Sequence, residues 1–372
     1  MTGRGTVVVV VGDLASSPRM VNHARELARA GPPVWLVGLR EREFAAPQGV
    51  CVVPLRGWRG IGALRLCGAA VRMGLTFLNL LAVLLRRRPA AILVQNPPAF
   101  PTLLAAWIAA RAVRSLLVVD WHNYGYSMLA LRLGTGHAFT RLAARHEGWM
   151  ARRAARHICV SQAMQADLGD RFGVRADVLY DRPLEYLSHL RGGAYLVAVC
   201  PSGWTADEDI ALLLDALEHL DAREIEIHIT GDGPLRAQLE PRIAGLRAAG
   251  WAVHTGFLKE AEYRALLGRC HLGLSLHRSS SGLDLAMKVV DLFAAGVPVC
   301  ALDYGGSLSE QVQDGETGFL FRTASELAGL LARLQRERSL LAPMRERIRE
   351  RWNVTWSEEW RRVAGPVFEG SS

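Results

Sequence analysis

The sequence has 372 residues, of which 50% are hydrophobic and 22% are charged, so we expect a globular, enzyme-sized protein with room for two domains. Six cysteines stand at scattered positions without C-x-x-C spacing, which argues against a disulfide framework and structural zinc and favours a reducing compartment. The net charge of +8 is uneven: residues 1–190 carry 24 basic and 11 acidic side chains, and residues 191–372 carry 20 and 25.

The first half of the chain begins with a run of β-branched residues from Thr6 that ends in a glycine turn, which indicates a strand buried on both faces. A helix over 21–31 and a strand over 33–39 complete a β-α-β unit. The alternation continues over 90–98, 115–123 and 157–173. The early strand leaves no place for a secretory signal.

The pattern restarts after 184–193, where Gly192 and Gly193 mark the expected boundary. A strand over 194–204, a helix over 208–220 and a strand over 225–235 follow. We therefore predict an α/β protein of two doubly wound, Rossmann-like domains, residues 1–190 and 191–351, facing each other across a cleft. The Trp-rich helix near 352–372 is expected to pack back on the first domain.

The first glycine turn reads G-D-L-A-S-S-P, so the dinucleotide fingerprint G-x-G-x-x-G is missing, which disfavours NAD or FAD. No Walker A sequence is present, which disfavours a P-loop NTPase. The basic first half instead suggests a nucleic acid, an acidic membrane or a phosphorylated substrate as partner, although a solvated arginine-rich surface would explain the same surplus. No nucleic-acid-reading motif accompanies it, so a nucleic acid is not expected.

Residues 277–299 combine three serines and a glycine with Asp284, Lys288 and Asp291. A helix starting here would offer N–H groups and its dipole to an anion, while Lys288 would face a phosphate and Asp291 a ribose. Asp284 could contact the ligand or simply cap the helix. Lys288 could alternatively form a surface ion pair with Asp291.

In the first domain, Asp13 ends the first strand and could take a proton from an attacking hydroxyl, or cap the next helix. Residues 120–128 gather polar and aromatic side chains at another strand end. An apolar stretch over 66–85 is interrupted by Arg72 and Asn79 and is followed by an arginine cluster. It is not a clean membrane span; it could attach to an anionic bilayer or form an ordinary core helix.

The strings GDLASSPRM, QNPP, DWHNYGYS, YDRP, SGWTADED, TGDGPLR and SSSGLDLAMKVVDLF resemble the chitobiosyldiphosphodolichol β-mannosyltransferase family, which has a GT-B fold. The resemblance covers about residues 6–360. It implies transfer of mannose from GDP-mannose to GlcNAc2-diphosphodolichol with a new β1,4 bond, and therefore inversion. Such a reaction needs a general base and a group that stabilises the departing diphosphate. The resemblance implies no tightly bound cofactor and no catalytic metal, although a divalent cation could stimulate.

The resemblance also assigns roles to residues. The catalytic candidates are Asp13 and, as its rival, His122. The candidate donor-binding residues are Trp204, Gly231, Gly233, Ser279, Ser280, Ser281, Gly282, Asp284, Lys288, Asp291 and Glu310. The candidate acceptor-binding residues are Ser16, Ser17, Arg19, Asn96, Asn123, Tyr124 and Tyr126.

The family carries a membrane anchor before the first strand, whereas this sequence has only MTGRG there. We therefore expect peripheral attachment through the basic and apolar first half, at the cytosolic face of the endoplasmic reticulum or of a bacterial membrane. Other glycosyltransferases of the pathway are possible partners. Two alternatives stay open: a retaining GT-B enzyme that uses another sugar nucleotide, and a nucleotide-sugar-binding, membrane-associated protein without turnover.

Overall fold

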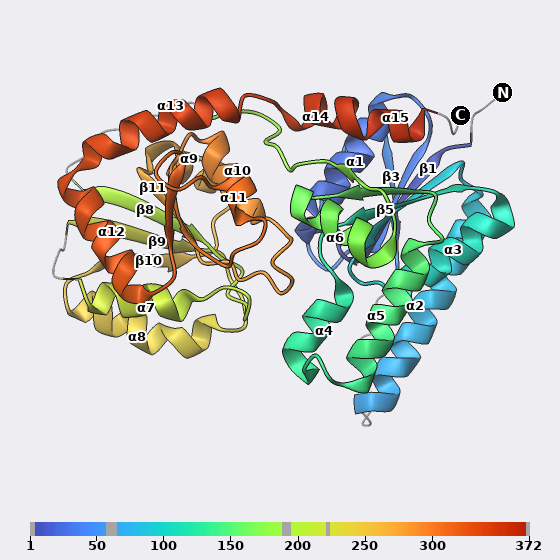
Figure 1. Cartoon of the computed structure of the whole chain (residues 1–372), viewed down its shortest axis with the longest axis horizontal. Helices are drawn as coiled ribbons and strands as arrows, with labels where there is room; N and C mark the ends of the chain where they lie inside the picture. The colour runs from blue at the N-terminus through green and yellow to red at the C-terminus, as the bar shows by residue number, and fades with distance from the viewer. Residues whose placement is uncertain (1–3, 57–64, 188–194, 221–223, 370–372) are drawn as a thin grey trace. The chain divides into compact units, whose positions relative to one another are not determined.

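The computed structural model describes residues 4–56, 65–187, 195–220 and 224–369, with side chains from residue 71 onward in the second range. The chain forms two compact units (Figure 1). Unit 1 comprises residues 1–180 and 356–372, and unit 2 comprises residues 181–355. The sequence-based boundaries were 190/191 and 351/352, and the glycine pair expected at the boundary lies outside the described residues.

Unit 1 is built on a parallel sheet of seven strands in the order β3-β2-β1-β4-β5-β6-β7. The strands are β1 (Thr6–Asp13), β2 (Val34–Leu39), β3 (Val50–Pro54), β4 (Ala91–Asn96), β5 (Leu116–Trp121), β6 (Arg156–Cys159) and β7 (Asp177–Val178). The helices are η1 (Leu14–Ser16), α1 (Pro18–Arg29), α2 (Arg65–Arg87), α3 (Thr102–Val113), α4 (Gly125–Leu133), α5 (Ala138–Ala151), α6 (Gln162–Phe172), α14 (Trp356–Val363) and α15 (Gly365–Phe368).

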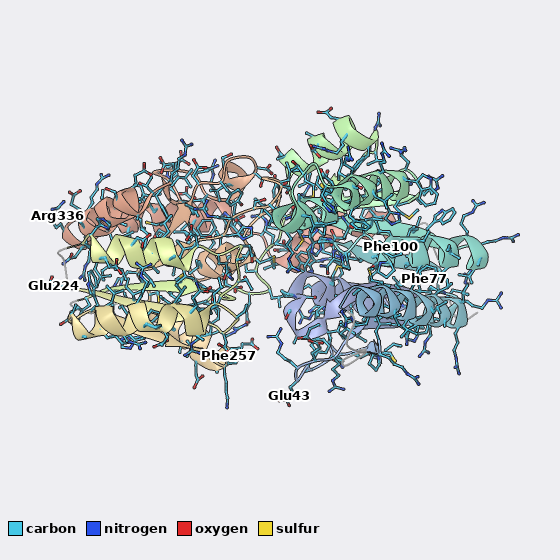
Figure 2. The ribbon with its side chains drawn as sticks, turned by 90° about the horizontal axis from the view of Figure 1, so that it is seen from below. Glu43, Phe77, Phe100, Glu224, Phe257 and Arg336 are labelled. Carbon is cyan, nitrogen blue, oxygen red and sulfur yellow. The ribbon has the colours of Figure 1, made fainter. Side chains whose placement is uncertain are left out.

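The valine run of β1 is buried on both faces of this sheet, as its sequence predicts. Val8 and Val10 belong to the core cluster that the sheet forms with α1 and α14. On the other side α2, α3, α5 and α4 lie in a row, seen in Figure 1 and, from below, in Figure 2, where Phe77 on α2 and Phe100 before α3 are labelled. After unit 2 the chain returns to unit 1, where α14 completes the core cluster.

Unit 2 has a parallel sheet of six strands in the order β10-β9-β8-β11-β12-β13. The strands are β8 (Leu196–Pro201), β9 (Ile225–Thr230), β10 (Ala252–Gly256), β11 (Leu272–Ser275), β12 (Val299–Leu302) and β13 (Gly318–Phe321). The helices are α7 (Ile210–Glu218), α8 (Arg236–Ala248), α9 (Glu260–Arg269), α10 (Met287–Ala294), α11 (Leu308–Gln311), α12 (Ala324–Arg336), η2 (Arg338–Leu340) and α13 (Leu341–Arg351). Apolar clusters cover both faces of the sheet, so unit 2 is also doubly wound.

Candidate active site

One carboxylate, Asp284, organises the loop that follows β11 in unit 2. Its Oδ2 lies 2.9 Å from His277 Nε2, and its Oδ1 accepts a hydrogen bond from the Ser279 hydroxyl. Burial would lower the pKa of His277, but the Asp284 carboxylate raises it above its usual value. The capping alternative for Asp284 is wrong, because α10 begins at Met287 with Ala286 as its N-cap.

The predicted serine and glycine group forms a single tight loop over residues 279–282. The Gly282 amide donates to the Ser279 hydroxyl over 2.7 Å, and the Ser281 hydroxyl accepts a backbone N–H two residues on. Gly282 has a φ of 74°, which glycine adopts without steric cost. A Cβ on Gly306 would lie 1.8 Å from the Gly282 carbonyl oxygen, so this loop and the one after β12 pack backbone against backbone.

Lys288, the predicted phosphate-binding cation, pairs with a residue that sequence analysis did not single out. It forms an ion pair with Glu208, which is 7% exposed and also accepts the Ser202 hydroxyl and the Gly203 N–H, each at 2.5 Å. Burial lowers the pKa of Lys288 to about 8, while Cys200 and the Asp207 carboxylate act in the opposite direction. No ion pair between Lys288 and Asp291 is present in the described part of the chain.

A small recess in unit 2 joins the ends of β8 and β11 with α10. Ser202, Glu208, Ser275, His277 and Lys288 are among the residues that line it. Such a meeting of parallel strand ends suits ligand binding in open α/β sheets.

Two further predicted donor residues lie on helices next to this loop. Asp291 is exposed to water over part of its side chain. Protein atoms around its carboxyl desolvate it, which raises its pKa to about 6. Glu310 lies on α11, and its amide donates to the Ser307 carbonyl over 2.9 Å. The Ser307 amide in turn donates to the Gly282 carbonyl over 3.0 Å, which ties α11 to the 279–282 loop.

The glycine turn after β9 packs on the end of β8. A Cβ on Gly231 would lie 1.9 Å from the Ser202 carbonyl oxygen, and one on Gly233 would lie 1.9 Å from that of Gly203. Backbone packing therefore requires both glycines. The side chain of Trp204, predicted to contact the donor, is instead fully buried in the apolar core of unit 2.

In unit 1, a buried charge network lies at the carboxyl end of β5. The Arg19 guanidinium donates twice to Asp120, over 2.8 and 2.9 Å, and His23 Nε2 lies 3.1 Å from the same carboxylate. Burial would raise the pKa of Asp120, but Arg19 and His122 hold it well below its usual range. Burial lowers the pKa of His23, which favours its neutral form. Arg19, predicted to contact the acceptor, is 3% exposed and therefore positions Asp120 instead.

The two candidate bases have different surroundings. His122 is partly exposed, and its Nε2 lies 2.8 Å from Asp120 Oδ2. When Nε2 donates its proton to Asp120, Nδ1 is the nitrogen that can accept one. Asp13 binds Arg42 over 2.7 Å and the Glu41 amide over 3.2 Å. Partial burial would raise the pKa of Asp13, but these two donors lower it overall, which makes its carboxylate a weaker base.

A second buried carboxylate, Glu147 on α5, fixes the loop between β5 and α4. It accepts from Asn96 Nδ2 over 2.7 Å and from the amides of Gly125 and Tyr126 over 2.9 and 2.8 Å. Asn96 is fully buried and also donates to the Asn123 carbonyl. Asn96, predicted to touch the acceptor, thus shapes the loop that carries Asn123 and Tyr126.

The remaining predicted acceptor residues differ in exposure. Tyr124 is fully buried, and its hydroxyl donates to Asp167 over 2.7 Å, so it belongs to the core. The Asn123 side chain is partly exposed and accepts the Tyr124 amide. Ser16 is exposed, and the Ser17 hydroxyl donates to the Asp13 carbonyl over 3.1 Å.

Sequence analysis did not single out Asp120 and Glu147, the two buried carboxylates that organise loops of unit 1, although the sequence itself indicates that both are buried. Asp120 and Glu147 are the only acidic residues between positions 44 and 166, and both are fully buried. Charged side chains are almost never fully buried unless they are paired. An isolated acid in such a basic stretch therefore indicates a buried partner.

Within the described residues, one group could be considered for a metal ion. Glu226, His228 and His254 lie on the neighbouring strands β9 and β10, with ligand atoms within 4.8 Å of one another. Arg269 donates to both Glu226 and His228 over 3.0 Å, so a positive charge already occupies this position.

None of the helices in the described ranges is both long enough and apolar enough to cross a membrane.

Two family models cover most of the chain. Residues 16–180 match the glycosyl transferase 4-like domain, and residues 195–337 match glycosyl transferases group 1. Among solved structures, the chain resembles sucrose-phosphate synthase from Thermosynechococcus elongatus, with a TM-score of 0.75, 15% identity and 99% of each chain covered. Anabaena HepE, solved with UDP and glucose, gives a TM-score of 0.72 at 18% identity over 99% of this chain and 100% of that one. The predicted GT-B fold is confirmed.

Proteins of similar sequence identify the family more specifically. The chain is 33% identical to the mouse chitobiosyldiphosphodolichol beta-mannosyltransferase, over 100% of this chain and 90% of that protein. It is 32% identical to the human protein of the same name, over 98% and 92%, and 33% identical to Arabidopsis UDP-glycosyltransferase TURAN, over 87% of each. The chain is a glycosyltransferase and belongs to the chitobiosyldiphosphodolichol beta-mannosyltransferase family.

Proposed function

We propose that the protein transfers mannose from GDP-mannose to GlcNAc2-diphosphodolichol and forms a β1,4 bond with inversion at the anomeric carbon. The likeness to the mouse mannosyltransferase carries this proposal, because it spans both units from end to end. No tightly bound cofactor is needed for such a displacement, although a divalent cation could still stimulate it. GDP-mannose and the lipid-linked acceptor are then the partners, rather than a nucleic acid.

Unit 2 would hold the donor. The recess beside Lys288, the 279–282 loop and the glycine turn after β9 lie at the carboxyl ends of its strands. Lys288 would face the diphosphate, after exchanging part of its contact with Glu208 for the ligand. Asp291, on the same helix as Lys288, would accept from the ribose hydroxyls. Glu310 would support the site from α11.

Unit 1 would supply the base. We favour His122 because Asp120 orients its ring and it is partly exposed, whereas Asp13 is engaged by Arg42. His122 Nδ1 would take the proton of the attacking acceptor hydroxyl while the carbon–oxygen bond to the diphosphate breaks. The predicted acceptor residues that are exposed or partly exposed are Ser16, Ser17, Asn123 and Tyr126.

The acceptor's lipid implies action at a bilayer. We propose peripheral attachment through the basic first half, at the cytosolic face of the endoplasmic reticulum or of a bacterial membrane. Other glycosyltransferases of the pathway would then share the same surface. The charge of unit 1 supports this proposal, since its stretch over 44–166 holds 15 arginines and only two acids.

The test is a panel of sugar nucleotides offered with synthetic diphosphate-linked GlcNAc2. We expect transfer from GDP-mannose alone, with a β1,4 linkage identified by NMR. Transfer from a different donor would overturn the donor assignment, and an α linkage would overturn inversion. GDP binding without any transfer would support a binding protein instead of the proposed enzyme.

The second candidate is a retaining GT-B transferase that uses another nucleotide. The relative named UDP-glycosyltransferase, at 33% identity, is the observation that favours it. UDP-sugars in the same panel separate the two candidates.

A further inference from the structure

The hairpin of α4 and α5 carries large apolar side chains on the surface of unit 1. We call these five side chains the hairpin patch, and their exposed fractions are 49% for Met128, 68% for Leu131, 43% for Leu133, 65% for Phe139 and 61% for Leu142. Single exposed apolar residues are ordinary in soluble proteins, but a contiguous group marks an interaction surface. Figure 1 shows α4 and α5 side by side at one end of unit 1.

Most of the residues that the two helices bury are small. Ser127 is the buried residue of α4, and α5 buries Thr140, Gly148 and Ala151 together with Glu147 and Met150. A helix that faces water normally buries its large apolar side chains and exposes its polar ones. Over residues 128–142 this hairpin instead exposes large apolar side chains together with polar ones, so its outer face is partly apolar.

The sequence around the hairpin patch is strongly basic. Residues 44–166 contain 15 arginines, no lysine and two acids, and both acids are fully buried. Arg132, Arg141 and Arg145 lie exposed on the hairpin itself. A surface that combines apolar side chains with cations complements an anionic lipid bilayer. A nucleic acid would use the cations but not the apolar side chains.

Helix α2, which packs on α3, also exposes apolar side chains. Val71 and Met73, near its amino end, are 47% and 42% exposed. In Figure 1 the amino ends of α2 and α5 lie at the same end of unit 1 as α4. Helix α3 lies between α2 and the hairpin, so these side chains of α2 are not part of the hairpin patch.

We propose that the hairpin patch inserts into the headgroup and upper acyl region of an anionic bilayer, with the neighbouring arginines bound to lipid phosphates. The proposal rests on the proposed function only in that a lipid-linked acceptor must be met at a bilayer. It assigns attachment to α4 and α5, beyond the 66–89 segment that the sequence pointed to.

The test compares two variants of the full chain in vesicle co-sedimentation. The first combines Leu131→Ser, Phe139→Ser and Leu142→Ser, and the control is Phe257→Ser, an apolar residue of unit 2 that is 68% exposed and labelled in Figure 2. We expect the triple variant to bind phosphatidylserine-containing vesicles more weakly by about tenfold or more, and the control to bind as wild type does. Wild-type binding should also weaken without phosphatidylserine and at high salt.

Three results would overturn the proposal. The first is equal vesicle binding by the triple variant and wild type. The second is loss of self-association, seen by light scattering, without loss of vesicle binding, because the patch would then face a second copy of the chain. The third is unchanged hydrogen exchange over 128–142 when vesicles are added to the wild-type protein. Because this third measurement needs no variant, it stands even if the triple variant folds poorly.

Transfer to a short-chain, water-soluble acceptor separates this proposal from the proposed function. The triple variant should retain wild-type turnover with that acceptor. If neither protein transfers mannose, the proposed function fails, while the vesicle result still decides the lipid contact.

Discussion

The carboxyl ends of the two sheets hold their loops in different ways. In unit 1 a buried carboxylate, Asp120, gathers Arg19, His23 and His122 into a charge network. In unit 2 the loops after β8, β9, β11 and β12 pack backbone against backbone at glycines, and few charges are buried. This difference agrees with the proposal that unit 1 orients a proton acceptor and unit 2 brings main-chain N–H groups close to an anion.

Removing the charge of Asp120, which holds the buried network of unit 1 together, should have the largest effect on stability. Asp120→Asn leaves the Arg19 guanidinium buried without a counter-charge, so the free energy of unfolding should fall by about 3–5 kcal/mol. Thermal or urea unfolding measures this. As a control, Glu346→Gln breaks an exposed pair with Arg349 and should cost less than about 1 kcal/mol. Equal losses in the two variants would show that the network does not hold unit 1 together.

The proton acceptor itself should matter for rate more than for stability. His122→Ala should lower kcat by roughly 10²- to 10⁴-fold and leave the donor KM unchanged, because the base acts only on the acceptor. Asp13→Asn is the paired variant, and its kcat should stay close to wild type because Arg42 already neutralises Asp13. Steady-state kinetics with a saturating acceptor decide between them. The reverse order of effects would make Asp13 the base.

Adding a methyl group to the glycine turn of unit 2 tests backbone packing. Gly231→Ala would place Cβ 1.9 Å from the Ser202 carbonyl oxygen at a φ of 95°, so it should destabilise unit 2 by about 1–3 kcal/mol or more. Gly245→Ala, on α8 with no atom within 4 Å of the added Cβ, should instead stabilise by roughly 0.5–1 kcal/mol. Urea unfolding of both variants measures the contrast, and a harmless Gly231→Ala would refute the packing argument.

The smallest expected effect is the pH dependence of donor binding. Burial lowers the pKa of Lys288 to about 8, so its charge is present below that pH and is lost as the pH rises. GDP affinity should therefore weaken by about fivefold between pH 7 and pH 10. Calorimetric titration across this range measures it. Lys288→Arg keeps its charge throughout and should show a flat profile; a slope that persists in this variant would place the titrating group elsewhere.

Local sequence patterns predicted most of the fold. The β-branched run of β1, buried on both faces, and the alternation of strands and helices in each half are set by neighbouring residues. The start of α10 was less predictable. A serine-rich loop with Asp284 resembles a cap, but Asp284 accepts from His277 and Ser279, and the helix starts only at Met287.

The sequence predicted several residues of the candidate site, but it did not predict which side chains pair with them. Lys288 stands out as one of two lysines in the chain, yet its partner Glu208 lies 80 positions earlier, and no periodic pattern links two such residues. Trp204 and Tyr124 were expected to contact ligands because the family resemblance implies it, but both side chains are buried in the core. Side-chain direction at a strand end depends on tertiary packing, which a linear pattern does not contain.

The return of the chain at α14 has a consequence for biosynthesis. Trp360 Nε1 donates to His23 Nδ1 over 2.9 Å, and Trp356 is fully buried in the core beside α1. Residues 356–369 are synthesised after all of unit 2. Until they emerge from the ribosome, part of the apolar face of unit 1 stays uncovered. Unit 2 is continuous in sequence and can fold first. A nascent chain that stops at residue 355 should therefore hold a folded unit 2 beside an incomplete unit 1, whose His23 and Asp120 still lack their final support.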